Sequence, residues 1–150
     1  MRLDAEKSPD REYLGKFLDL AKRAKGTDAG VRACQWVVGT GSRSADGKKP
    51  AEEALDLALS TGLASPAMAD IAQSLRYASR GLGEEKVVAA LRTIGEKAAV
   101  PDARAAGLFG LAALWTEGQD AGKKKEARAL FDRLLKEFPA SPPAKQAKGF

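Results

Sequence analysis

The chain has 150 residues, of which 44% are apolar and 30% are charged, and its formal net charge is +5. This length suits one domain with a substantial core. The chain lacks histidine, the commonest general base and metal ligand, and its single cysteine excludes an intrachain disulfide, a CxxC pair and a cysteine-rich zinc site. We therefore expect no catalytic residue, no cofactor and no metal in these residues, and no enzyme activity.

The apolar composition favours helices over strands, because alanine and leucine dominate while valine, isoleucine and threonine are sparse. No apolar run approaches the roughly 18 residues that a membrane-spanning helix needs. Residues 1–7 are polar and charged, so we expect no signal peptide. A segment cut from a longer secreted protein would begin in the same way, and the compartment therefore stays open.

Apolar residues recur at helical spacing in about seven segments that are bounded by capping residues, glycine or proline. The predicted helices begin at or near Pro9, Thr27, Pro50, Pro66, Glu84, Pro101 and residue 123. Glycines mark the ends of several of them, at Gly26, Gly62, Gly81 and Gly118. We predict that residues 1–8 are disordered or extended and that residues 9–139 form the helical domain. Residues 140–150 are predicted to be a tail or the start of a truncated helix.

Residues 39–49 form the most loop-like stretch of the chain and superficially resemble a phosphate-binding loop. The spacing differs, because five residues rather than four separate Gly41 from Gly47. In addition, Lys49 stands where the motif has serine or threonine, and no strand precedes the loop. The pattern therefore does not predict nucleotide binding.

The predicted helix that begins at Pro101 carries small residues at three- and four-residue spacing. They are Ala103, Ala106, Gly107, Gly110 and Ala113. Glycine inside a helix costs about 1 kcal/mol relative to alanine. Two glycines on one stripe therefore predict that the backbone of a neighbouring helix passes close by.

The net positive charge comes from the C-terminal end of the chain. Residues 121–150 contain 8 basic and 3 acidic residues, whereas residues 1–120 contain 17 of each. Such a region can bind nucleic acid or an anionic membrane. Because acidic residues interrupt the basic ones, a solvated helix face is the favoured interpretation.

Pairing the predicted helices gives units that start near residues 9, 50, 84 and 123, with separations of 41, 34 and 39 residues. Helix pairs with periods of 34 to about 47 residues are typical of TPR and HEAT-type solenoids. An irregular helical bundle with evenly long elements is the alternative. We predict an all-α fold in which antiparallel helix pairs form a short right-handed TPR-like or HEAT-like solenoid.

The last long helix carries the clearest family resemblance. The spacing of Ala127, Phe131, Leu134 and Pro139 resembles the second helix of a TPR unit. In such a unit the preceding helix has a small residue where its partner crosses, a part that Gly110 could play. Leu134 departs from the pattern, which has a small residue there, and the loop between the helices is about five residues longer. We expect Leu130, Phe131 or Leu134 to leave a partly exposed apolar flank at the end of the array.

A second resemblance extends over nearly the whole chain. Residues 17–21, 33–39, 51–57, 105–112 and 127–139 are similar to a helical segment that precedes thioredoxin-like (redoxin) domains in planctomycete-type bacterial proteins. The resemblance implies an extracytoplasmic parent protein with a CxxC-bearing domain beside this one. If the resemblance is set aside, the expected compartment is the cytoplasm. No oxidoreductase activity transfers to these residues, because Cys34 has no partner cysteine.

Six residues are candidates for contact with a partner: Trp36, Tyr77, Trp115, Lys123, Lys124 and Lys125. The aromatic residues could anchor a peptide on a concave face, although core packing is the alternative for each. Cys34 is interpreted as a small core residue. We expect a non-catalytic interaction or scaffold module whose partner is a protein, a peptide or an adjoining domain. The alternatives are an accessory segment of a redoxin and, less favoured, nucleic-acid or anion binding by the basic end.

Overall fold

The computed structural model describes residues 9–44 and 46–148, and every regular element within them is helical. In chain order the helices are α1 (Pro9–Arg23), α2 (Asp28–Gly41), α3 (Lys48–Thr61), α4 (Met68–Leu75), α5 (Ser79–Leu82), α6 (Glu84–Lys97), α7 (Pro101–Thr116), α8 (Ala121–Glu137) and α9 (Pro142–Ala147). The predicted all-α class is confirmed. The segment 1–8 that was predicted to be disordered or extended lies outside the described residues.

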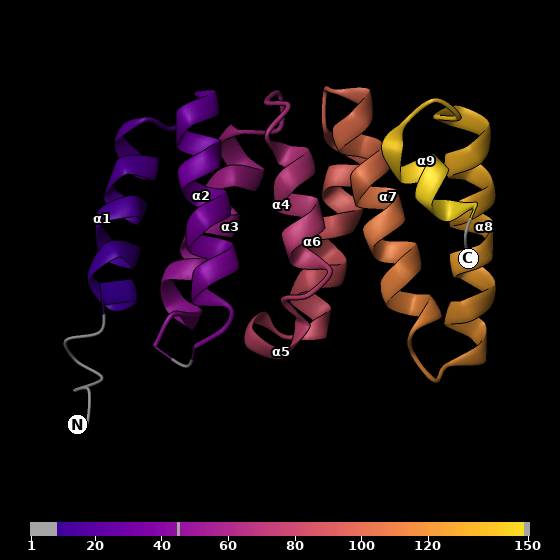
Figure 1. Ribbon diagram of the computed structural model, residues 1–150, viewed down its shortest axis with the longest axis horizontal. Helices are drawn as coiled ribbons and strands as arrows, with labels where there is room; N and C mark the ends of the chain where they lie inside the picture. The colour runs from indigo at the N-terminus through magenta and orange to yellow at the C-terminus, as the bar shows by residue number, and fades with distance from the viewer. Residues whose placement is uncertain (1–8, 45, 149–150) are drawn as a thin grey trace.

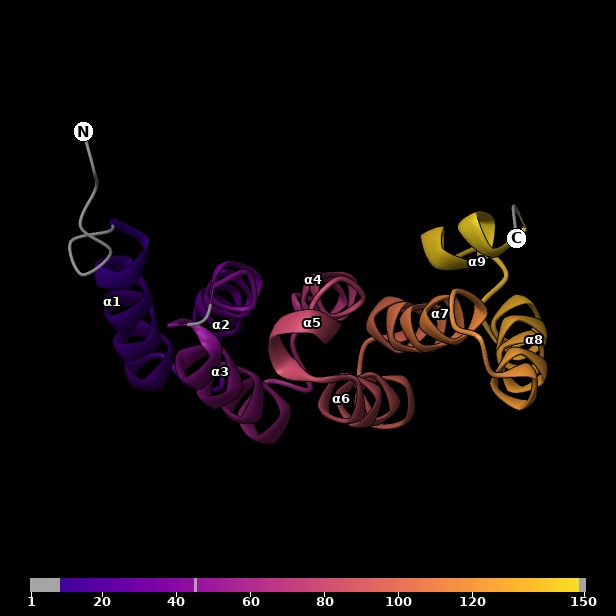
Figure 2. The same cartoon turned by 90° about the horizontal axis from the view of Figure 1, so that it is seen from below.

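The helices stand side by side in a long row that runs from α1 at one end to α8 and α9 at the other (Figure 1). In the view from below, α2, α4 and α9 lie along one side of the row, while α3 and α6 lie along the other (Figure 2). Helix α7 joins the two sides, because it packs against α4 and α9 as well as α6 and α8. The chain therefore crosses repeatedly from one side of the row to the other.

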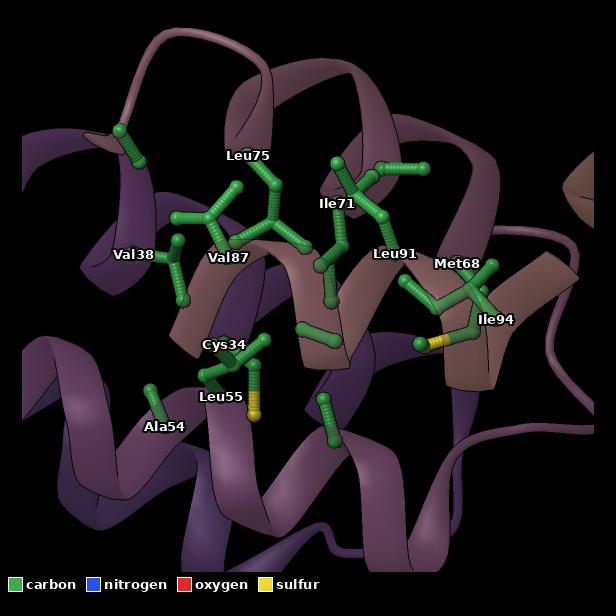
Figure 3. Packing of buried hydrophobic residues seen from close by; sticks show 14 of the residues in the cluster. Cys34, Val38, Ala54, Leu55, Met68, Ile71, Leu75, Val87, Leu91 and Ile94 are labelled. Carbon is green, nitrogen blue, oxygen red and sulfur yellow. The ribbon is translucent and has the colours of Figure 1, made fainter. Parts of the chain in front are cut away.

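One continuous apolar core runs through most of the row. It includes completely buried side chains from α3, α4 and α6, among them Leu55, Ile71 and Leu91; in Figure 3, Ile71 and Leu91 lie near each other, and Leu55 lies beside Cys34. Burying a leucine or isoleucine side chain stabilises the folded state by about 1.5–3 kcal/mol. The shared core therefore links α3, α4 and α6, and their neighbours α2 and α7 pack against α4 on either side.

The structure has nine helices in its described residues, rather than about seven. Helix α5 is additional, and α9 is a six-residue helix within the segment 140–150 that was predicted to be a tail or the start of a truncated helix. The single helix predicted from Pro66 to Gly81 is wrong. Helix α4 begins at Met68 and ends at Leu75, and a turn separates it from α5. Elements of four and six residues span too few turns to show a helical period in the sequence.

The starts of two predicted helices also shift. Helix α3 begins at Lys48, so Pro50 is its third residue rather than its first. Helix α8 begins at Ala121, because the side chain of Asp120 accepts a hydrogen bond from the backbone N–H of Lys123 at 3.1 Å and caps the helix. By contrast, Thr27 caps α2 as predicted and accepts from the backbone N–H of Gly30 at 3.1 Å.

Helix α7 is the most buried element of the row. All five members of its small-residue stripe are buried, and they are Ala103, Ala106, Gly107, Gly110 and Ala113. Gly107 lies against the backbone of α6, and Gly110 faces both α6 and α4. The predicted close approach of a neighbouring backbone is confirmed.

A second apolar cluster joins α7, α8 and α9 at the C-terminal end of the row. Its buried members are Ala105, Phe109, Ala113, Leu134, Ala144 and Ala147. The expected partly exposed flank is present at Leu130 and Phe131, which are half-buried. Leu134 is completely buried instead, because the short helix α9 packs its alanines over it.

In the part of the chain that the structure describes, no helix combines the length and apolar character needed to cross a membrane.

Candidate functional site

Two grooves adjoin each other on the side of the row that α2, α4, α7 and α9 form, and Tyr77 lines both. The groove between α2 and α4 has a volume of about 360 Å³ and is lined by Gln35, Trp36, Gly39, Thr40, Ser42, Arg43, Ser74 and Tyr77. The groove between α4, α7 and α9 has a volume of about 440 Å³ and is lined by Ala72, Gln73, Arg76, Tyr77, Ala106, Phe109, Gly110, Pro143 and Gln146. We call the residues of both grooves the Tyr77 face.

Tyr77 is the most exposed large hydrophobic side chain of the described residues, with 77% of its surface accessible. It lies in the turn after α4, where its backbone N–H donates a hydrogen bond to the carbonyl oxygen of Ser74 at 3.2 Å. The turn ends the regular helix, so the side chain stands out from the row. A tyrosine in this position offers both apolar area and a hydroxyl to a partner.

Arg76 ties the base of Tyr77 to α7. Its guanidinium carbon lies 5.3 Å from the ring centre of Tyr77 and 5.5 Å from that of Phe109. Its Nη2 atom donates a hydrogen bond to Glu117 Oε1 at 2.8 Å. Because a charged hydrogen bond and two ring contacts act on one side chain, Arg76 holds the floor of the second groove in a defined shape.

Trp36 lies at the far end of the Tyr77 face, on α2. Its ring is half-buried and packs against Phe17 of α1, with 4.5 Å between the ring centres and 30° between the ring planes. The remaining surface of the indole lines the groove between α2 and α4. Trp36 and Tyr77, both predicted contact residues, therefore lie in one groove.

Glutamine side chains are concentrated along this face. Of the four glutamines in the chain, Gln35, Gln73 and Gln146 line its grooves, and they come from α2, α4 and α9. Each amide both donates and accepts hydrogen bonds. Amides in both of the grooves that Tyr77 lines suit the main chain of an extended peptide, which presents donors and acceptors in alternation.

Trp115, the third aromatic candidate, lies apart from the Tyr77 face. Its side chain is 6% exposed, and it contributes to the main core. The guanidinium of Arg92 lies 5.8 Å from its ring centre, on the side of the row that α6 and α8 form. The structure therefore places Trp115 in a packing role, with little surface left for a partner.

The three lysines at the start of α8 separate into two environments. Lys123 Nζ lies 3.8 Å from Glu84 Oε1 and so links α8 to α6. Lys124 and Lys125 line a different groove, between α8 and α9, which we call the α8–α9 groove. The structure brings these two together but keeps them away from Tyr77.

Cys34 is buried in the main core, as the sequence predicted. Desolvation by burial raises the pKa of its thiol from 9.0 to about 11. A thiol with this pKa carries almost no nucleophilic thiolate near neutral pH. Among the described residues, no cluster of three or more cysteine, aspartate or glutamate side chains has a geometry that could hold a metal ion.

Sequence reasoning missed several lining residues of the Tyr77 face, above all Arg76, Phe109 and the three glutamines. The glutamines carried a partial signal, since Gln35 and Gln73 lie on different predicted helices and few other amides occur in the chain, whereas Gln146 lies in the segment that was predicted to be a tail or the start of a truncated helix. Arg76 and Phe109 carried none, because their proximity depends on how α4 packs against α7.

No protein-family model matches the chain, and neither a curated protein nor a solved structure matches it.

Proposed function

We propose that this chain is a non-catalytic helical-repeat interaction module and that it binds an extended peptide segment along the Tyr77 face. The observation that carries the proposal is the meeting of two grooves at Tyr77, a side chain that is 77% exposed. Large aromatic residues that project from a groove floor are typical anchors of peptide recognition.

The arrangement of the helices supports a repeat architecture of the TPR type. The chain alternates between the side of α2 and α4 and the side of α3 and α6, as helices do in a two-layered solenoid. Gly110 does not take the expected part of the small residue that its partner helix crosses in the TPR-like final unit, because its nearest neighbours are Leu91 of α6 and the carbonyl oxygen of Ala72 in α4 rather than residues of α8. In the right-handed solenoid that we propose, one layer of helices lines the binding surface, and we assign the Tyr77 face to that layer.

The chemistry of the face favours a peptide over a small charged substrate. Its lining residues are aromatic rings, amides and short side chains, with Arg43 and Arg76 as the charged groups. The same groups also suit a segment of an adjoining domain, which is how an accessory segment of a redoxin would use this surface. No contact among the described residues favours that alternative, and it stays a prediction.

A peptide selection followed by targeted substitution tests the proposal. Peptides from a random display library are selected on the wild-type chain, and their affinities are then measured for the wild type and for Tyr77→Ala. Tyr13→Ala is the matched control, because Tyr13 is also exposed, at 47%, but lies on α1 outside both grooves. Loss of a central aromatic anchor should weaken binding by about tenfold or more.

Both substitutions remove exposed rings, so both variants should unfold at the wild-type temperature. Selected peptides that bind Tyr77→Ala as tightly as the wild type would show that the Tyr77 face is not the binding surface.

A further inference from the structure

The α8–α9 groove is a second open surface, distinct from the Tyr77 face. Helix α8 has 17 residues and α9 has only six, so α9 covers part of the length of α8 (Figure 1). The uncovered remainder forms a groove of about 760 Å³ between α8, the end of α7 and the end of α9. This volume falls within the range of sites that bind sizeable ligands.

Positive charge gathers around this groove. Lys124, Lys125 and Arg128 line it from α8, and Lys148 lines it from the end of α9. All four residues are exposed, and in the described part of the chain none of them lies within 4.0 Å of a carboxylate oxygen. One acidic residue, Asp132, lines the same groove. The surface therefore carries a local excess of positive charge that the fold itself does not neutralise.

The charged and apolar residues are segregated along α8. Lys124 and Arg128 occupy its first two turns, and the half-buried Phe131 and Leu135 follow on the same face at helical spacing. Phe131 packs edge-on against Phe109, with 6.0 Å between the ring centres. This contact fixes the position of the Phe131 ring at the apolar end of the groove. An occupant that lies along α8 would meet cations at one end and apolar side chains at the other.

We propose that the α8–α9 groove binds an acidic amphipathic segment of another protein, with its carboxylates on the lysine side and one or two large apolar side chains over Phe131 and Leu135. The basic residues of the groove complement the carboxylates of such a segment, and its apolar floor complements the apolar side chains. Lysines at the start of a helix also oppose the positive end of its dipole. Carboxylates of the partner would offset that repulsion.

A nucleic-acid backbone fits this groove less well. Phosphates favour a row of cations, whereas Asp132 interrupts the basic row here and the apolar side chains of Phe131 and Leu135 line the same groove. A peptide, by contrast, can place a backbone N–H against Asp132 and an apolar side chain on the floor. The test therefore also measures whether the groove binds nucleic acid instead of an acidic peptide.

The probe is a fluorescein-labelled synthetic helical peptide with leucines at one end and glutamates at the other, made in both orders. Its binding to the full chain is followed by fluorescence anisotropy. Two altered peptides replace either the glutamates by glutamine or the leucines by serine. A single-stranded oligonucleotide with the same label is measured alongside them.

The double variant Lys124→Glu/Lys125→Glu should weaken binding of the acidic peptide by about tenfold or more, because the change reverses the charge at the contact. Lys136→Glu/Lys145→Glu is the matched control: it makes the same change in net charge at exposed positions outside the groove and should change affinity by less than about threefold. Each altered peptide should bind more weakly than the parent peptide. The Tyr77→Ala variant should bind the parent acidic peptide with the wild-type affinity. This result would show that the α8–α9 groove and the Tyr77 face are separate binding surfaces.

Three results would overturn the inference. The first is that neither version of the acidic peptide binds at about 100 μM. A dissociation constant above this value would correspond to an affinity too weak for a specific site. The second is an equal loss of affinity in the two double variants, which would indicate attraction to net charge alone. The third is binding of the oligonucleotide with the same response to Lys124 and Lys125, which would assign the groove to nucleic acid.

Discussion

Gly107 of α7 lies directly against Gly95 of α6. A Cβ atom at Gly107 would lie 2.5 Å from the backbone nitrogen of Gly95 and 2.9 Å from the carbonyl oxygen of Leu91. Both of these atoms belong to the backbone of α6 and cannot rotate away. The two helices therefore pack backbone to backbone at this point, and α7 is held close to the centre of the row.

Gly107→Ala should destabilise the protein, and Gly107→Leu should do so more strongly, because any side chain forces α6 and α7 apart. Overpacking of this kind typically costs about 1–3 kcal/mol. The measurement is the free energy of unfolding in a denaturant titration.

Gly15→Ala is the control for Gly107. A Cβ atom at Gly15 on α1 would have no heavy atom within 4 Å, and the residue is exposed. The substitution should stabilise the protein by about 0.5–1 kcal/mol through helix propensity alone. If alanine changed the free energy of unfolding in the same direction at Gly107 and Gly15, α6 and α7 would not be in backbone contact at Gly107.

Cys34 should resist thiol reagents in the native protein at about pH 8 and should react once the chain is unfolded, because burial disfavours the thiolate. Time-resolved reaction with an aromatic disulfide reagent measures this. Rapid modification without denaturant would contradict the buried, protonated thiol.

The same thiol predicts a dependence of stability on pH. Its pKa is higher in the folded chain, about 11, than the reference value of 9.0, so the folded state holds the proton more tightly. The contribution is complete below pH 9 and is lost as the pH rises toward 11, with a slope of at most about 1.4 kcal/mol per pH unit. Other groups also titrate in this range, so the test compares the wild type with Cys34→Ala, and the difference between them should narrow as the pH rises.

Ser65 should contribute to stability through two hydrogen bonds. Its hydroxyl donates to Asp28 Oδ1 at 2.7 Å and accepts from the backbone N–H of Ala67 at 3.1 Å. The residue is 5% exposed, so Ser65→Ala leaves a buried N–H without its partner and should cost about 1–3 kcal/mol. Urea titration measures the loss.

Ser60→Ala is the comparison for Ser65, because Ser60 is exposed and bonds only to Leu57 of its own helix. Its effect should stay within about 0.5 kcal/mol. A double-mutant cycle between Ser65→Ala and Asp28→Ala isolates the link between α2 and the turn before α4. If the losses of unfolding free energy in the two single variants add up to the loss in the double variant, the hydrogen bond between Ser65 and Asp28 contributes nothing to stability.

Ala144→Glu should destabilise the C-terminal end of the row. Ala144 is completely buried against α7 and α8 in the second apolar cluster. A carboxylate there must either remain unpaired among apolar groups or push α9 away from Leu134 and Phe109, and we expect a loss of about 2 kcal/mol or more. Lys145→Glu makes a larger charge change at the neighbouring exposed position and should leave the melting temperature nearly unchanged. Equal melting temperatures for the two variants would mean that α9 does not cover the cluster.

The positions of most long helices follow from the sequence because their causes are local. Thr27 caps α2 through its own side chain, and Pro101 stands at the first turn of α7, where its missing N–H carries no cost. The prediction failed between Ser65 and Gly81. There the hydroxyl of Ser65 bonds to Asp28, 37 residues earlier in the chain, and the helix gives way to the turn that carries Tyr77.

The sequence alone determined the all-α class, the approximate bounds of the long helices, the burial of Cys34 and the close packing at Gly107, since composition, helical period and residue size dictate these features. Only the tertiary structure decided which aromatic residues remain open. Trp36 and Tyr77 line one face, whereas Trp115 is buried, although the sequence offered all three as candidates for contact with a partner. The physical reason is that an amphipathic pattern shows which side of a helix faces a neighbour, whereas the distance to the next pair of helices decides how much of that side stays uncovered.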